Sequence, residues 1–125
     1  MIMATVIAGI ITEKGDLYKM KNLLFVCEGN EQRSPSFVLW FKEHRSEYNV
    51  RSAGTHSVYF VQINKELLEW ADRVFLMDLE QEVFLMREFP EFIFKCEIIG
   101  CSDQYQRESF ELNRLIEYWV CKRGL

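Results

Sequence analysis

Residues 22–35 read NLLFVCEGNEQRSP. The apolar run over 22–26 is typical of a central parallel strand, because such a strand is buried on both of its faces. Cys27 ends this run, a Gly-Asn pair follows, and Pro35 suits the first turn of a helix. The stretch therefore predicts a buried strand, a short loop and a helix in immediate succession.

The same alternation of strand and helix recurs along the chain. Further strands are predicted over 49–53, 73–77 and 94–99, and a helix over 80–89 is expected to stop at Pro90. Other helices are indicated by apolar residues at helical spacing. These residues are Phe37, Trp40 and Phe41, then Ile63, Leu67, Trp70 and Ala71, and finally Leu112, Leu115, Ile116 and Trp119.

Alternating strands and helices favour a parallel sheet that is covered on both sides. Together with right-handed crossovers, the pattern predicts an α/β fold: a doubly wound four-stranded parallel sheet of order 2-1-3-4, with helices on both faces. We expect residues 21–125 to form a single domain, and residues 1–20 to be an N-terminal extension or an accessory edge segment. In such sheets a ligand lies beyond the carboxyl ends of the strands, which is where Cys27 falls.

The composition excludes several classes of function. The chain has 125 residues, of which 49% are hydrophobic, and a net charge of −4. This charge disfavours nonspecific binding of nucleic acid, which requires a basic surface. The apolar run Ile2–Ile11 is too short to span a membrane and lacks the positive flank of an export signal. We therefore expect no nucleic-acid partner and no membrane partner.

The cysteine pattern indicates free thiols. The chain has four cysteines, and no two of them have the C-x-x-C spacing that is typical of zinc sites. We therefore expect no metal site, and we expect the thiols to stay reduced in the cytoplasm.

The loop after the first strand has the features of a phosphate site. A helix N-terminus presents backbone N–H groups and the positive end of the helix dipole, both of which bind phosphate. Gly29 and Asn30 tolerate the positive φ that a wrapped loop requires. The same field favours the thiolate of Cys27, and the planar guanidinium of Arg33 can hold two phosphate oxygens. A bound phosphate or sulfate is therefore expected between Cys27 and Arg33.

The binding residues of this loop are predicted to act mainly through their backbone. They are Glu28, Gly29, Asn30, Glu31, Gln32, Arg33 and Ser34. Ser34 is also expected to donate a hydrogen bond to the Cys27 sulfur. The C-x5-R spacing alone arises easily by chance, and Cys27 could simply be a buried cysteine at a strand end. The preceding strand, the Gly-Asn pair and the helix start together favour the functional interpretation.

Four segments carry a resemblance to a known family. They read LFVCEGNEQRSP (24–35), SAGT (52–55), ADRVFLMD (71–78) and SDQY (102–105). In this order they resemble the low-molecular-weight protein tyrosine phosphatases, over about residues 21–119. The resemblance implies hydrolysis of a phosphorylated protein or a small aryl phosphate through a cysteinyl-phosphate intermediate, with no cofactor.

The resemblance also implies a role for each matching residue. Cys27 would be the nucleophile, Arg33 the clamp for the phosphate and the transition state, Asp103 the general acid, and Tyr105 a residue flanking the pocket mouth, with Asn30 holding the loop shape through Ser52. The position of Asp103 supports its role independently, because it follows the last predicted strand at the same sheet edge as Cys27. Its alternative is a helix cap or turn residue.

Two departures from the family bear on the activity. Gln32 stands where the family commonly has a second cysteine, and Gln104 stands where it commonly has proline. The stretch over 55–71, which normally supplies an aromatic pocket wall, is also shorter than usual. A phosphate-binding or phosphopeptide-binding module without turnover therefore remains an alternative.

Two other enzymes fit parts of the pattern. An arsenate reductase on the same fold would need a relay of cysteines, for which Cys96 and Cys101 are available. An RNA polymerase tail phosphatase shares the C-x5-R-S spacing, but the segments at 52–55 and 102–105 favour the low-molecular-weight family.

Overall fold

In the computed structural model of the chain, strand β3 (Asn22–Cys27) is the centre of a four-stranded sheet. It pairs in parallel with β4 (Asn49–Gly54) on one side and β5 (Arg73–Leu76) on the other. Strand β6 (Cys96–Ile98) pairs in parallel with β5 and completes the order β4-β3-β5-β6. Counted along the chain, this is the predicted order 2-1-3-4, so the predicted fold class is confirmed.

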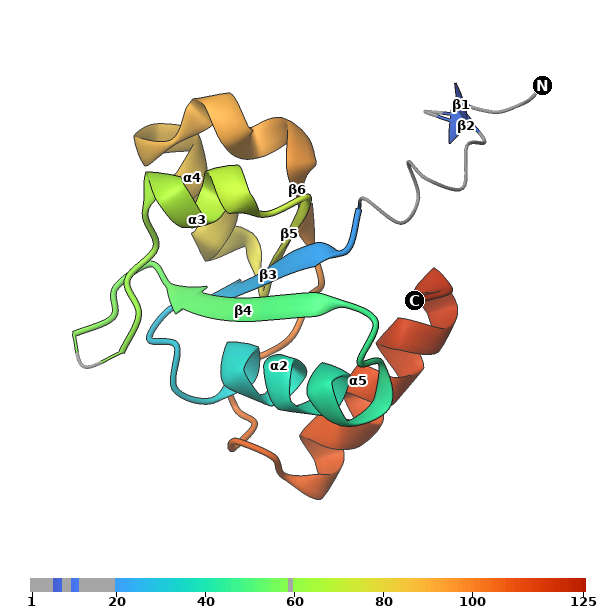
Figure 1. Ribbon diagram of the computed structural model, residues 1–125. Coiled ribbons are helices and arrows are strands. Elements are labelled where there is room, and N and C mark those ends of the chain that lie inside the picture. The colour runs from blue at the N-terminus through green and yellow to red at the C-terminus, as the bar shows by residue number, and fades with distance from the viewer. Residues whose placement is uncertain (1–5, 8–9, 12–19, 59) are drawn as a thin grey trace.

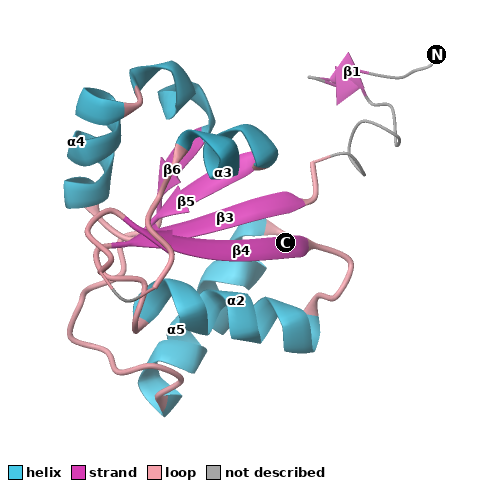
Figure 2. Ribbon diagram, turned by 60° about the vertical axis from the view of Figure 1, so that its left-hand side comes forward, coloured by secondary structure: helices cyan, strands magenta, loops and turns pink. Residues whose placement is uncertain are grey.

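Helices cover both faces of this sheet (Figure 1). Helices α2 (Arg33–His44) and α5 (Phe110–Arg123) lie on one face. Helices α3 (Lys65–Trp70) and α4 (Leu79–Glu88) lie on the other, together with the 3-10 helix η1 (Pro90–Lys95). The same two layers, with the twisted sheet between them, are seen in Figure 2.

Strand β3 supplies both layers of the core because its successive side chains point to opposite faces. On the α2 and α5 side, the Phe25 ring lies 5.2 Å from the Phe37 ring and 5.4 Å from the Phe75 ring, measured between centroids. On the α3 and α4 side, Leu24 and Val26 belong to the second buried cluster. Burial on both faces explains why β3 carries an unbroken apolar run and why its carboxyl end is held rigidly.

The prediction of a strand over 94–99 is wrong at its start. Phe94 and Lys95 belong to η1, and β6 begins at Cys96. Pro90 ends α4 as predicted, but proline also suits the first turn of a new helix. The chain therefore forms the 3-10 helix η1 before the strand begins. The Phe94 side chain is exposed and therefore supplies no buried strand position.

The structure describes residues 6–7, 10–11, 20–58 and 60–125. Strands β1 (Val6–Ile7) and β2 (Ile10–Ile11) pair with each other in an antiparallel sheet of their own. Most of the segment predicted as an extension or an edge strand, residues 1–20, lies outside the described residues. Within the described part of the chain, each helix is too short or too polar to span a bilayer.

Candidate active site

Cys27 lies at the carboxyl end of β3, where its sulfur is enclosed by the following loop. The backbone N–H of Asn30 donates a hydrogen bond to Cys27 Sγ at 3.1 Å, and the Ser34 hydroxyl lies 3.0 Å from the same sulfur. The residue is only 2% exposed. The thiolate is the nucleophilic form of cysteine, and the Asn30 N–H is a hydrogen-bond donor directed at this sulfur. The predicted contact between Ser34 and Cys27 is present, although the single proton of the Ser34 hydroxyl is donated to Asn30 Oδ1 in this structure.

The loop turns at Asn30. Its φ is +55°, whereas Gly29 does not have a positive φ. The expectation that both residues use positive φ is thus met by Asn30 only. Asn tolerates this left-handed conformation better than most residues because its short side chain can bond locally. Here Asn30 Oδ1 accepts a hydrogen bond from the Ser34 hydroxyl at 3.0 Å.

Arg33 is the first residue of α2, and it is 4% exposed. Its Nη1 donates to Asp78 Oδ2 at 2.8 Å and to the backbone carbonyl of Cys101 at 2.8 Å. Asp78 lies two residues beyond the end of β5 and caps α4, so its carboxylate is held at the same sheet edge as Cys27. These contacts orient the guanidinium from the protein side. Asp78 ends the segment ADRVFLMD (71–78), and its contact with Arg33 was not predicted from the sequence.

A second segment, at the end of β4, holds the loop from outside. Thr55 N–H donates to the Cys27 carbonyl at 3.0 Å, and His56 N–H donates to the Glu28 carbonyl at 2.8 Å. The Ser57 hydroxyl donates to the Gly29 carbonyl at 3.0 Å. Three successive carbonyls of the loop are thus fixed by three successive residues, which directs these carbonyls away from the phosphate position.

Gly54 allows this close approach. A Cβ atom at Gly54 would lie 2.6 Å from the Glu28 carbonyl oxygen and 2.9 Å from the Asn30 nitrogen. Both are backbone atoms of the loop, so the loop itself would have to move. The support predicted for this loop was a contact from Ser52 to Asn30. In the structure Ser52, in β4, lies opposite Phe25 of β3. The side chain of Asn30 instead accepts its hydrogen bond from Ser34.

Gly54→Ala is therefore expected to displace the loop and to weaken phosphate binding by at least about 10-fold, at a cost of about 1–3 kcal/mol in stability. The matched control is Gly29→Ala, whose Cβ would meet only Glu31 side-chain atoms at 3.6–3.7 Å. Inhibition by inorganic phosphate and urea unfolding would measure the two effects. Equal behaviour of the two variants would contradict the role given to Gly54.

Asp103 faces the loop from the segment that follows β6. It is exposed and lines an open depression of about 320 Å³ together with Cys27 and Arg33. The remaining lining residues are Glu28, Gly29, Glu31, Gln32 and His56. The structure thus brings the predicted nucleophile, clamp and acid around one cavity. Tyr105 is not among its lining residues; it is half-buried and packs against the core.

Two side chains at the start of α2 hold the chain beyond Asp103. Gln32 Oε1 accepts a hydrogen bond from Arg107 N–H at 2.5 Å. The Ser36 hydroxyl accepts one from Glu108 N–H at 2.8 Å and donates to the Gln32 carbonyl at 2.7 Å. Gln32, predicted only as a phosphate-binding residue, links the loop after β3 to the segment that follows Asp103.

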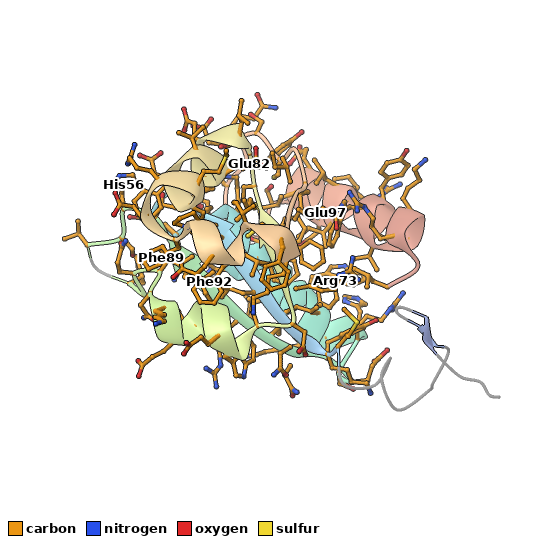
Figure 3. All side chains as sticks on the ribbon, turned by 90° about the horizontal axis from the view of Figure 1, so that it is seen from above. His56, Arg73, Glu82, Phe89, Phe92 and Glu97 are labelled. Carbon is orange, nitrogen blue, oxygen red and sulfur yellow. The ribbon has the colours of Figure 1, made fainter. Side chains whose placement is uncertain are left out.

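His56 lines the depression as well, although no role was predicted for it from the sequence. Its Nδ1 lies 3.1 Å from the Thr55 hydroxyl, and its ring lies edge-on to Phe84 with 5.3 Å between centroids. Figure 3 shows His56 at one end of the molecule, whereas Arg73 and Glu97 lie toward the other end. Its position directly after the SAGT segment is the signal that could have indicated it.

The other cysteines do not match a thiol relay. Burial raises the pKa of Cys101 to about 11, and burial together with the Glu82 carboxylate raises the pKa of Cys96 to about 11. Both thiols therefore stay protonated at neutral pH, whereas exchange between thiols requires the thiolate. This observation disfavours the arsenate reductase alternative.

Solved structures provide the comparison. The tyrosine phosphatase Wzb from Escherichia coli K30, in complex with phosphate, is 18% identical and matches with a TM-score of 0.70, over 84% of this chain and 96% of that one. Wzb from Vibrio vulnificus, in complex with benzylphosphonate, is 17% identical, with a TM-score of 0.71 over 85% and 99%. The chain has the fold of these phosphatases. The fold that the sequence resemblance implied is thereby confirmed.

An arginine phosphatase has the same phosphatase fold. YwlE from Geobacillus stearothermophilus is 22% identical, with a TM-score of 0.65 over 83% of this chain and 93% of that one. No protein-family model and no curated protein matches the sequence. The shared fold therefore includes phosphatases that act on different phosphorylated side chains.

Proposed function

We propose that this protein is a cysteine-dependent phosphatase that hydrolyses phosphomonoesters through a cysteinyl-phosphate intermediate. The observation that carries the proposal is the common depression lined by Cys27, Arg33 and Asp103. The helix start leaves the N–H groups of Arg33 and Ser34 without intrahelical acceptors, and it presents them at this end of α2. A phosphate dianion at this position would meet N–H donors, a guanidinium and a nucleophilic sulfur together.

In the first step the Cys27 thiolate attacks phosphorus. The P–S bond forms as the P–O bond to the leaving group breaks, and Asp103 in its acid form gives its proton to the departing oxygen. The guanidinium of Arg33 and the loop N–H groups stabilise the charge on the equatorial oxygens.

In the second step a water molecule attacks the phosphorus of the cysteinyl phosphate. Asp103, now a carboxylate, takes the proton from this water, and the P–S bond breaks. Cys27 returns as a thiolate, which accepts a hydrogen bond from the Asn30 N–H. The products are inorganic phosphate and the alcohol, and the proposed reaction uses no metal ion and no organic cofactor.

Hydrolysis of a small aryl phosphate tests this function. We expect steady release of inorganic phosphate, with competitive inhibition by added phosphate or sulfate, because these anions occupy the same loop. Binding of phosphate with no turnover would overturn the enzymatic proposal and favour the non-catalytic binding module.

A phosphorylated protein is the proposed natural substrate, with phosphotyrosine the first candidate, because the segments at 24–35 and 102–105 resemble tyrosine phosphatases. A cytoplasmic location is supported by the four free cysteines.

Asp103→Asn is expected to slow aryl phosphates with poor leaving groups by about 10²-fold or more and those with good leaving groups much less. A poor leaving group depends on protonation as it departs, whereas a good one leaves as the anion. Steady-state kcat/KM over a series of substituted phenyl phosphates would measure this, because kcat/KM reports the steps up to the loss of the leaving group and not the later step in which Asp103 acts as a base. Glu91→Gln, which changes an exposed carboxylate outside the depression, is the control. An equal loss for all leaving groups would contradict the acid role.

A further inference from the structure

The depression around Cys27 offers little to hold the organic part of a substrate. Among the described residues that line it, none has an aliphatic or carbocyclic aromatic side chain; Glu28, Glu31, Gln32, Arg33 and Asp103 are polar, and His56 supplies the single ring. Such a surface binds phosphate but gains little from an apolar group. Any apolar part of a substrate must therefore be buried elsewhere.

An apolar groove lies directly beside this depression. The groove has a volume of about 380 Å³ and shares two lining residues with the depression, Glu28 and His56. The other lining residues are Thr55 and, from the start of α4 onward, Leu79, Glu80, Gln81, Val83, Phe84 and Arg87. The two cavities therefore lie side by side, and Glu28 and His56 border both of them.

The wall of the groove is a stripe along α4. Leu79, Val83 and Arg87 are four residues apart, so they lie on one side of the helix. The Leu79 side chain is 61% exposed and that of Val83 is 50% exposed. Phe84 lies between the His56 ring, at 5.3 Å, and the Arg87 guanidinium, at 5.8 Å from its centroid. Apolar side chains left in water beside a polar site are a typical feature of a surface that binds a ligand.

We infer that this groove binds an apolar side chain adjacent to the phosphorylated residue of a protein substrate. The inference rests on the proposed function, since a phosphate held by Cys27 and Arg33 fixes the position of the phosphorylated residue of the peptide. The peptide then continues past Glu28 and His56, the two residues common to both cavities. A phosphorylated residue flanked by leucine would bury the leucine against Val83 and Phe84, whereas one flanked by glycine would leave the groove filled with water.

Two phosphotyrosine peptides test the inference, one flanked by leucine on both sides and one flanked by glycine. We expect the natural protein to show a kcat/KM about 10-fold higher for the leucine peptide, because burial of one such side chain has an effect of this order. Val83→Asp should remove this preference, and Leu79→Asp is a second variant in the same wall. Met86→Asp is the matched control, because Met86 is 57% exposed on the same helix but does not line the groove.

The same peptides are also measured by binding to the Cys27→Ser variant, with and without Val83→Asp, so that the groove is tested independently of turnover. A preference for leucine in binding that Val83→Asp abolishes would support the groove even if no substrate is hydrolysed. Hydrolysis of a small aryl phosphate at an unchanged rate in all three α4 variants would show that the catalytic loop is intact. No preference in the natural protein, or an equal loss in Val83→Asp and Met86→Asp, would overturn the inference.

Discussion

Cys27→Ser is expected to lower the rate of phosphate release by about 10⁴-fold or more, which is typical of the loss of a catalytic nucleophile. A serine hydroxyl is a far weaker nucleophile than a thiolate at neutral pH, and the loop groups that contact Cys27 Sγ, the Asn30 N–H and the Ser34 hydroxyl, are not bases. The substitution is nearly isosteric, and the contacts from Asn30 N–H and the Ser34 hydroxyl can be made to an oxygen. The folded loop and its affinity for phosphate are therefore expected to survive.

The measurement combines turnover of an aryl phosphate with binding of inorganic phosphate to the same preparation. Cys121→Ser serves as the control, because Cys121 is an exposed thiol on α5 that does not line the depression. It should keep full activity. Retention of more than about a tenth of the activity by Cys27→Ser would be incompatible with a covalent intermediate on this sulfur.

Arg33→Ala is the second large effect. We expect kcat/KM to fall by about 10³-fold, because one side chain contributes both to phosphate binding and to stabilisation of the transition state. Among the described residues, the hydrogen bonds of the Arg33 side chain to protein atoms all come from Nη1, to Asp78 and to the Cys101 carbonyl. Its other N–H groups are thus available to phosphate oxygens.

The comparison with Arg33→Lys separates charge from geometry. Lysine keeps the positive charge but presents a single point instead of a planar fork, so it should recover only part of the loss. Arg73→Lys is the control, because Arg73 pairs with Glu97 away from the depression. Full activity of Arg33→Lys would show that the fork is not used. Unfolding measurements should show a cost of about 1–3 kcal/mol for Arg33→Ala, since Asp78 and the Cys101 carbonyl lose a donor.

The sequence by itself was sufficient for the sheet order and for the identity of the candidate loop. The apolar run before Cys27 fits an interior strand that is covered on both faces, and right-handed crossovers then limit the possible strand orders. The helix start after Gln32 places Arg33 on the same loop as Cys27, because only five residues separate them. These features are local, and local spacing is directly readable in a chain.

The boundary between η1 and β6 could not be read in the same way. Phe94 looks like a strand residue from its neighbours, yet it stays exposed while Phe92 is buried in the core. A single apolar residue near a proline is compatible with either conformation. Packing against the rest of the protein decides between them.

Contacts between distant segments needed the tertiary structure. Asp78 holds Arg33 across 45 positions of the chain, Arg107 binds Gln32 across 75, and Gly54 gives room to a loop that begins at Cys27. Each of these pairs meets only because parallel strands end at one edge of the sheet. Periodicity and motif spacing describe neighbours along the chain, so they were sufficient to predict which residues carry the proposed chemistry. Only the tertiary structure, which brings distant segments together, decided which other residues hold these predicted residues in position.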